Sequence, residues 1–367
     1  MPRGIHILLR TGLSLGITLA LILHVSGYFP LPLLSQLELF AYDARLRLTL
    51  PGGVDPRIVI VDIDETSLLR EGQWPWPRQR LTQLVDTLFS YYQIRLLAFD
   101  IVFAEAERNP MLTALDHLAQ GALREDAPFQ QHWTQLRSQL AGDDRLAASF
   151  RDRAVVMGYY FAMLDQQGGD LRVGQLPPAA APLTVLGGIP NPFATAAGYS
   201  ANLPLLQASA ASGGFFNSTL VDPDGLFRRL PLLVGYDGQF YEHFSLAVVR
   251  TLLGHPPLEF VTAPGYQDGG QRVEAVRIGV FDIPIDVQGA ALAPYRGPQG
   301  SFPYIPAHAV LDRQADPQAL AGTIVLVGAT AAGLMDLRAT PVQNIYPGVE
   351  VNATLIAGIL DQRIKSR

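Results

Sequence analysis

The sequence contains no cysteine and only one lysine, Lys365, among its 367 residues. Without thiols the protein has neither a disulfide framework nor a thiolate metal site. The lack of cysteine is compatible with folding in an oxidising compartment, although it does not prove residence there. Charged residues make up 16% of the chain and hydrophobic residues 49%, a balance that favours a folded chain with a large core over a disordered one.

Signals for several function classes are also missing. The net charge is −6, and no basic run with interleaved aromatic residues appears, so the sequence gives no reason to expect a nucleic-acid partner. The seven histidines show no metal-ligand spacing, and no Gly-x-Ser-x-Gly elbow is present. We therefore predict no cofactor, no bound metal and no nucleic-acid partner.

The N-terminal segment predicts a membrane anchor. Residues 11–29 contain no charged residue other than a potentially protonated His24, and about 20 apolar residues cross a bilayer. Arg3 and Arg10 precede the segment, so the positive-inside rule keeps residues 1–10 in the cytoplasm. A cleaved signal peptide has the same charge pattern, but no Ala-x-Ala site follows, and we favour an uncleaved anchor in the inner (cytoplasmic) membrane. Both interpretations place the bulk of the protein in the periplasm or another extracytoplasmic space.

The chain after the anchor predicts a short helix and one large α/β domain. Residues 30–50 carry apolar residues at three- and four-residue spacing, which indicates a juxtamembrane helix. Residues 51–363 form the domain, in which apolar runs that predict buried strands alternate with helical patterns. This alternation favours a mainly parallel sheet flanked by helices. The strands are expected at 58–64, 94–103, 154–162 and 323–330, and the helices at 78–92, 111–150 with a break at Gly142, 243–254 and 349–362.

The middle of the domain has weaker patterns. Residues 165–212 are rich in proline and glycine, and we expect loops with one helix near 200–211. In residues 213–242 the turn formers Pro-Asp-Gly and Asp-Gly interrupt apolar runs, which predicts a three-stranded antiparallel meander. A further pair of short strands is expected at 272–287.

The stretch IVIVDIDETSLL at residues 58–69 is similar to the first motif of haloacid-dehalogenase-like phosphatases. In that resemblance Asp62 is the nucleophile and Asp64 the general acid and base, with a magnesium ion bound between carboxylate and phosphate. Such a site also needs a cation, usually lysine, and carboxylates on a later strand. Lys365 lies near the C-terminus and no other strand ends in an acidic pair, so an extracytoplasmic phosphatase is the alternative hypothesis, not the preferred one.

A series of further motifs supports a different family. The motifs, in chain order, are Glu38, Tyr42-Asp43-x-Arg45, IVIVDIDETSL, Trp74-Pro75-Trp76-Pro77-Arg78, AFDIVF, Gly214-Phe215-x-Asn217, Asp224-Gly225-x-x-Arg228 with Pro231, Tyr295-Arg296-Gly297, VLVGATAAGLMD, Thr340-Pro341 and Pro347-Gly348-Val349-Glu350-Val351-Asn352-Ala353. Together they resemble the type-two CHASE domain, the extracytoplasmic sensing module of bacterial adenylate cyclases, histidine kinases, diguanylate cyclases and Ser/Thr kinases. The sequence departs from this family at Asn352, where histidine is common, and residues 165–212 match nothing in it.

The resemblance implies a sensor whose output lies elsewhere. It implies signal transduction across the membrane, a homodimer, and no catalytic activity within these 367 residues. The output domain is expected to follow this chain in the full-length protein, with a class III adenylate cyclase, which makes cAMP, as the first expectation. A purely structural dimerisation domain remains a third hypothesis. The signal, a small molecule or another periplasmic component, is not encoded in any motif.

Candidate site residues come from the rule that ligands of open α/β sheets bind beyond the carboxyl ends of the strands. Asp62, Asp64, Asp100 and Thr330 follow strand ends, and they converge if the strands are neighbours. Their carboxylates can pair with arginine, line a small-ligand pocket or hold a hard cation. The remaining candidates for ligand binding or structural pairing are Trp76, Arg78, Asn217, Asp224, Arg228, Arg296, Asp336 and Glu350.

Overall fold

The computed structural model describes residues 3–26, 28–29, 31–163, 171–217, 220–265, 270–334 and 336–366. The chain divides into two units, Met1–Leu50 and Pro51–Arg367. The first unit contains two helices, α1 (Arg3–Val25) and α2 (Pro32–Leu48), and α2 lies where the juxtamembrane helix was predicted. Over the described residues, no helix combines the length and the apolar character needed to cross a membrane. The membrane-spanning helix expected at 11–29, which includes the undescribed Gly27, is therefore unconfirmed.

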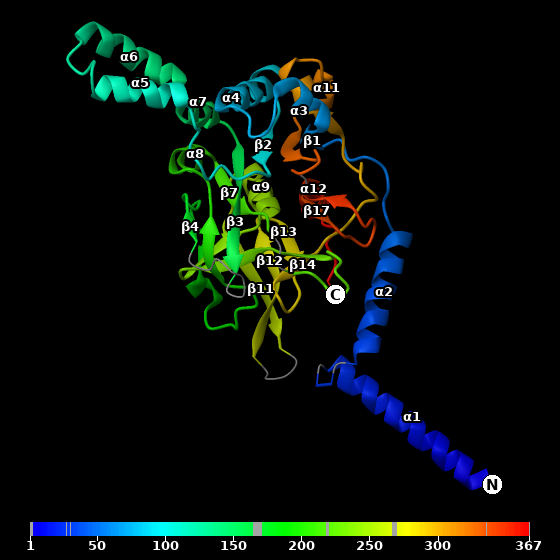
Figure 1. The fold of residues 1–367 in the computed structure, drawn as a ribbon. Coiled ribbons are helices and arrows are strands. Elements are labelled where there is room, and N and C mark those ends of the chain that lie inside the picture. Colours follow the sequence, from blue (N-terminus) through cyan, green and yellow to red (C-terminus); the bar gives the residue numbers. More distant parts are fainter. Residues whose placement is uncertain are drawn as a thin grey trace. The chain divides into compact units, whose positions relative to one another are not determined.

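A mainly parallel sheet forms the centre of the second unit, with the strand order β15-β1-β16-β2-β3-β6-β4 and with β7 paired to β3 (Figure 1). Its members are β1 (Ile58–Ile63), β2 (Leu96–Phe99), β3 (Val155–Met163), β4 (Arg172–Val173), β6 (Ala196–Ser200), β7 (Ser212–Phe215), β15 (Tyr304–Pro306) and β16 (Ile324–Ala329). The β3–β6 pair is antiparallel, and the other pairs in this sheet are parallel. The predicted α/β class with a mainly parallel sheet is thus confirmed.

Helices cover both faces of this sheet. Side chains alternate between the faces of a strand, so Val59, Val61 and Ile63 lie on one face with Val325 and Val327. That face packs against helices on the β1–β2 and β2–β3 connections and after β15, while α9 and α12 contact the strands as well as each other. The helices on these connections are α3 (Glu65–Glu71), α4 (Arg78–Asp86), the π-helical turn η1 (Thr87–Tyr91), α5 (Pro110–Gln120), α6 (Ala127–Leu140), α7 (Gly142–Phe150), α10 (Ala307–Leu311) and α11 (Pro317–Leu320). The pair that contacts β7 and β16 is α9 (Phe244–Leu252) and α12 (Gly348–Leu360).

The predicted three-stranded meander at residues 213–242 is wrong. β7 belongs to the central sheet, β8 pairs with β14, and only β9 and β10 form a hairpin, which β5 extends. A three-stranded antiparallel sheet does occur further on, in the order β11-β12-β13, and it contains the strand pair predicted at 272–287. The turn residues correctly predicted where the chain bends. Which strands pair with one another depends on long-range packing, which the turns do not determine. These elements are β5 (Ala181–Pro182), β8 (Arg229–Pro231), β9 (Leu233–Tyr236), β10 (Gln239–Glu242), β11 (Leu258–Pro264), β12 (Gln271–Ile278), β13 (Phe281–Pro284) and β14 (Ala290–Leu292).

The stretch 165–212 contains more order than predicted. Its helix, α8 (Pro204–Ser209), lies within the expected 200–211 range, and a 3-10 turn, η2 (Leu183–Leu186), precedes it. The sequence patterns missed β4 and β6, which extend the edge of the main sheet. Residues 165–170 of this stretch lie outside the described residues. A small pair, β17 (Leu337–Arg338) and β18 (Tyr346–Pro347), leads into α12.

Candidate functional site

Three parallel strands bring the main candidates to one edge of the sheet. β16 lies between β1 and β2, so the two acidic strand ends are not adjacent as the convergence hypothesis required. Asp62 is on the end of β1, Asp100 follows β2, and Thr330 follows β16 between them. The strand order therefore separates Asp62 from Asp100 and gives each carboxylate its own surroundings.

The Asp62 carboxylate accepts hydrogen bonds from Thr330, the residue that follows the neighbouring strand β16. Its two carboxylate oxygens accept hydrogen bonds from the Thr330 backbone N–H, at 3.0 Å, and from the Thr330 hydroxyl, at 2.6 Å. Burial raises the pKa of Asp62, and the two bonds from Thr330 oppose that rise. Asp62 thus fastens the loop after β16 to the end of β1.

The neighbouring acidic residues have similar local roles. Asp64 is the N-cap of α3 and accepts a hydrogen bond from the Ser67 N–H at 2.8 Å. Glu65 accepts one from the Ala332 N–H at 2.6 Å. Both oxygens of Asp62 and one oxygen of Asp64 therefore accept hydrogen bonds from the chain itself. Within the described ranges, no group of three or more His, Asp or Glu side chains is placed to hold a metal ion.

Asp100 instead lines a cavity of about 200 Å³ at the ends of β2 and β16. We call it the Asp100 cavity. Its wall combines an aromatic side chain, aliphatic side chains, two carboxylates and the first residues of α12. The lining residues are Trp74, Asp100, Ile101, Ala329, Leu334, Asp336, Gly348 and Val349. A second space of about 20 Å³ shares Asp100, Asp336 and Gly348 and adds Arg338 and Asn352.

The electrostatics of Asp100 differ from those of Asp336. Burial and the nearby Asp336 carboxylate raise the pKa of Asp100 to about 7, and Asn352 and Arg338 offset only part of that rise. Arg338 donates to Asp336 at 2.6 Å, and its guanidinium carbon lies 4.8 Å from the centre of the Phe227 ring. In the described part of the chain, no cationic side chain forms an ion pair with Asp100. The cavity therefore contains a carboxyl group that changes its charge near neutral pH.

A larger hollow of about 690 Å³ adjoins the Asp100 cavity through Trp74, and residues 74–78 and 102–108 line it. Arg78 is buried there and donates to Asp143 at 2.7 Å and to the Glu105 carbonyl at 2.8 Å. Trp76 is also buried, and its indole N–H donates to the Gly72 carbonyl at 2.9 Å. Both candidates are occupied by protein partners and shape the wall of the hollow.

Three other candidates have partners of their own. The Asn217 side chain forms two hydrogen bonds with the backbone of Phe161, at 2.9 and 2.8 Å, in the manner of a strand partner. Arg228 binds both oxygens of Asp224, at 2.8 and 2.6 Å, and lowers the pKa of that carboxyl. The residues at this turn are consistent with a structural role.

The last two candidates, Glu350 and Arg296, lie in α12 and near its C-cap. Glu350, on the first turn of the helix, is fully buried and accepts hydrogen bonds from the Gly300 and Ser301 N–H groups and from the Tyr304 hydroxyl. Arg296 lies 3.6 Å from Asp55 and 3.6 Å from Asp361, the C-cap of the helix. α12 is thus held at both ends.

Sequence reasoning did not select Trp74, Arg338 or Asn352 as site residues. Trp74 belongs to the same motif as the selected Trp76, and Arg338 follows the selected Asp336 by two residues. This closeness in sequence to selected residues was the only indication that could have pointed to Trp74 and Arg338. The sequence did not show whether Trp74 or Trp76 faces the Asp100 cavity. Asn352 bonds to Ser245 as well, with the Ser245 hydroxyl 3.1 Å from its carbonyl oxygen.

The fold is that of an α/β domain with a mainly parallel sheet and a cavity at the carboxyl ends of its strands, the place where open α/β sheets bind ligands. The chain matches the sequence model of the CHASE2 domain over residues 16–367. No curated protein and no solved structure matches it. The chain therefore belongs to the CHASE2 family, the extracytoplasmic sensory domains of signalling receptors, as the motifs had suggested.

Proposed function

We propose that this chain is the signal-sensing region of a membrane-bound bacterial receptor and that its ligand binds in the Asp100 cavity. The family supports the sensory role, and the cavity lies where open α/β sheets bind ligands. The wall combines apolar side chains with the carboxylates of Asp100 and Asp336, which can fix the orientation of a small ligand.

The observation that carries the proposal is the position of α12. Gly348, Val349 and Asn352, in its first turns, line the cavities, while Asp361 at its end pairs with Arg57 at 2.8 Å. Arg57 in turn pairs with Asp55 at 2.6 Å, in the segment that leads into β1. One helix therefore connects the cavity with the points where the chain enters and leaves the domain. A ligand that favours one position of α12 changes the relation of these two points, and that change is the signal.

The anchor, the output domain and the dimer of this proposed receptor are inferred from the sequence. In this proposal residues 11–29 anchor the protein in the inner membrane, so that the domain is periplasmic. A cytoplasmic output domain, an adenylate cyclase as the first expectation, follows in the full-length protein. The receptor is a homodimer that uses α2, whose Leu33, Leu37, Phe40 and Leu48 side chains are exposed.

A ligand screen tests the sensing site. Small periplasmic metabolites are added to the full chain and the melting temperature is measured, since a ligand that binds only the folded state raises it. We expect at least one metabolite whose shift disappears in Asp100→Asn. The matched control is Asp237→Asn, in the exposed turn between β9 and β10, which keeps the shift. A screen without any shift favours a structural dimerisation domain and contradicts the proposal.

A second experiment tests the output. Cells that express the product of the whole gene are assayed for cAMP with wild-type protein and with Arg57→Gln, which breaks the contact with Asp361. We expect the variant to fold and to lose the dependence of cAMP on the ligand. Ligand-dependent cAMP that persists in this variant argues against transmission through α12. Hydrolysis of a generic phosphate ester by the wild type but not by Asp62→Asn would establish the phosphatase instead.

A further inference from the structure

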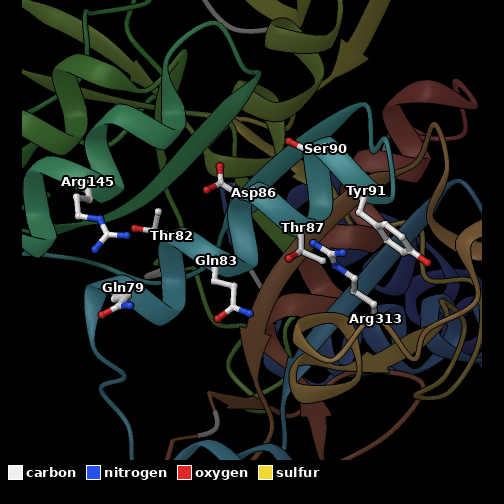
Figure 2. Close-up of a pocket in the computed structure, with 9 residues that line it drawn as sticks. All are labelled: Gln79, Thr82, Gln83, Asp86, Thr87, Ser90, Tyr91, Arg145 and Arg313. Carbon is white, nitrogen blue, oxygen red and sulfur yellow. The ribbon is translucent and has the colours of Figure 1, made fainter. Parts of the chain in front are cut away.

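Two hollows of the domain differ in what their walls imply about a ligand. A hollow of about 470 Å³ lies along one face of α4 and η1 and shares no lining residue with the Asp100 cavity (Figure 2). Figure 2 shows polar side chains along it, among them Gln79, Gln83 and Ser90, which are exposed. This is the ordinary composition of a solvated helix face. In the Asp100 cavity, by contrast, aromatic and aliphatic side chains surround a carboxyl group, and that combination restricts the chemistry of a ligand.

Asp100 lies beside aromatic rings in both of the spaces that it lines. Trp74 belongs to the wall of the Asp100 cavity, and Phe216 and Phe227 line the adjoining space of about 20 Å³. Aromatic rings attract cations through their quadrupole, and tryptophan does so most strongly. The Phe227 ring already has such a partner in the guanidinium group of Arg338. The same interaction is available to a cationic ligand at Trp74 and Phe216.

The charges around the cavity leave Asp100 in need of a positive partner. Arg338 donates to Asp336, so the one arginine in the lining compensates the other carboxylate. Asn352 also contacts Asp100, but its amide is uncharged. Burial and the nearby Asp336 raise the pKa of Asp100 to about 7, so the carboxyl keeps a proton where a cation is missing. An anionic ligand would bring a third negative charge to this place, whereas a cation can replace the proton.

The size and composition of the cavity favour an organic cation over a metal ion. Its volume of about 200 Å³ lies below the roughly 300–1,000 Å³ of drug-sized ligand sites, so the ligand is small. Calcium takes about six to eight oxygen ligands, and among the described residues no three His, Asp or Glu side chains are grouped to hold a metal ion. The Asp336 side chain is 54% exposed, which indicates that the cavity opens to solvent on that side.

We propose that the ligand of the Asp100 cavity is a small organic ammonium ion. Its charged nitrogen lies against the Asp100 carboxylate, and its alkyl groups contact Trp74 and Phe216. On binding, the Asp100 carboxyl releases its proton to the solvent, so a carboxylate–ammonium pair replaces a neutral carboxylic acid. This inference rests on the proposed function, because it names the ligand class of the same cavity.

Calorimetric titration of the full chain tests the inference with choline, ethanolamine and neohexyl alcohol, the uncharged counterpart of choline in shape. The titrations are made at pH 8 in a low-salt buffer that contains no amine. We expect choline or ethanolamine, or both, to bind, and neohexyl alcohol not to bind. Tighter binding of choline identifies a methylated ammonium ligand, and tighter binding of ethanolamine identifies a primary amine.

The proton of Asp100 provides a second readout. Below pH 7 the affinity for the cation is expected to fall about tenfold per pH unit, because Asp100 must first lose its proton. Asp336 and Arg338, the charged groups near Asp100, bind each other throughout this comparison. Asp100→Asn keeps the site uncharged and is expected to bind choline at least tenfold more weakly than the wild type at pH 8. The difference is expected to shrink at pH 5, which a merely structural role of Asp100 does not produce.

Two further variants and a control locate the cation. Trp74→Leu keeps an apolar wall but removes the cation–π contact, so the affinity is expected to fall severalfold, and Trp74→Phe is expected to restore part of it. Melting curves check that each variant folds. Asp237→Asn, in the exposed turn between β9 and β10, is the control and keeps the wild-type affinity and its pH dependence.

Three outcomes overturn the inference: failure of both cations to bind, equal binding of neohexyl alcohol, or wild-type affinity of Asp100→Asn at pH 8. A metabolite without an ammonium group whose melting shift requires Asp100 also overturns it, but leaves the sensing role of the cavity intact. Failure of the two cations together with every metabolite of the screen overturns the inference and the proposed function alike.

Discussion

At the residue scale, two aspartates at the carboxyl ends of β1 and β2, which β16 separates, have different chemistry because they meet different donors. Asp62 receives both a hydroxyl and a backbone N–H from Thr330. Asp100 faces a second carboxylate, Asp336, whose own charge Arg338 already compensates. Burial raises the pKa of both carboxyl groups, but the Thr330 bonds oppose the rise at Asp62, whereas Asp336 adds to it at Asp100, whose pKa reaches about 7.

The first prediction concerns Asp100→Asn. The pKa of Asp100 is about 7 in the folded protein and about 3.9 in an unfolded chain, so between these values the folded state holds a proton that the unfolded state has released. The free energy of unfolding of the wild type therefore falls as pH rises from 4 to 7. Asp100→Asn removes this fall, which amounts to roughly 2–4 kcal/mol after a discount for partial solvent exposure.

Urea denaturation from pH 4 to pH 8 measures this difference. Asp62 and Glu350 also have raised pKa values and contribute to the slope with the same sign, so the comparison with the wild type isolates Asp100. Asp237→Asn is expected to keep the wild-type slope. A slope in Asp100→Asn that equals that of the wild type would contradict the raised pKa.

The second prediction concerns Thr330→Val. The substitution removes the hydroxyl donor and leaves Asp62 with the backbone bond alone, so the free energy of unfolding at pH 7 is expected to fall by about 1–3 kcal/mol. The loss shrinks at acidic pH, where Asp62 is protonated in both states. Thr134→Val, which removes an exposed hydroxyl bound only to the Gln130 carbonyl, is the control and changes stability by less than about 0.5 kcal/mol. Equal effects of the two substitutions would refute the role of the Asp62–Thr330 contact.

At the element scale, α12 is held along its whole length. Its first turn carries the buried carboxylate of Glu350, which binds the loop before β15 at Gly300 and Ser301. Burial raises the pKa of Glu350, and the hydrogen bonds from Tyr304 and the two N–H groups oppose that rise. The helix continues past Pro294 to the ion pairs of Asp361. A helix fixed in this way moves as a rigid unit, which suits a transmission element.

The third prediction is that Gly358→Ala destabilises the domain although alanine is the better helix former. Helix propensity favours alanine over glycine by about 1 kcal/mol. A β-carbon at position 358, however, would overlap the ring of Pro294. Overpacking of this kind costs about 1–3 kcal/mol, so the net effect is expected to be a loss of stability. Thermal unfolding measures it, and a melting temperature at or above that of the wild type would show that α12 and Pro294 can separate.

At the scale of the whole molecule, the proposed receptor needs a second copy of the chain. The exposed apolar stripe of α2 repeats at four- and three-residue spacing through Leu33, Leu37 and Phe40, the pattern by which two helices pack along a seam. Leu37 and Phe40 are 53% and 71% exposed in the single chain. Burial of this stripe against its counterpart is the largest gain that α2 offers to association.

The fourth prediction is that Leu37→Glu shifts the full chain from dimer to monomer. The charge would be buried in the seam without a partner, and this desolvation is unfavourable. Sedimentation velocity over a range of concentrations measures the equilibrium. Gln36→Glu adds the same charge one residue away, beside the stripe, and is expected to leave the dimer intact. A wild-type chain that is monomeric at all concentrations would remove α2 as the contact.

Much of the architecture could be predicted because it depends on local patterns. The continuous apolar runs of β1 and β16 mark strands buried on both faces, and the apolar spacing of α4 marks a helix with one buried face, while α9 and α12 are apolar and buried almost all round. Ordered motifs along the chain also identified the family. These features are properties of short segments, so the sequence alone was enough.

The site depended on what segments far apart in the sequence do together. β16 inserts between β1 and β2 although more than 200 residues separate it from either. As a result Thr330, which follows β16, donates a hydrogen bond to Asp62, while Asp100 lies near Asp336 and Asn352. Strand order reflects which apolar faces pack best in the whole domain, and no local pattern encodes it. The sequence by itself determined the central buried strands β1, β2, β3 and β16, most of the helices, the family and the acidic residues at the strand ends. Only the tertiary structure decided that the Asp62 carboxylate is hydrogen-bonded to Thr330 and that Asp100 faces a cavity, because these contacts depend on the neighbours that each strand end acquires on folding.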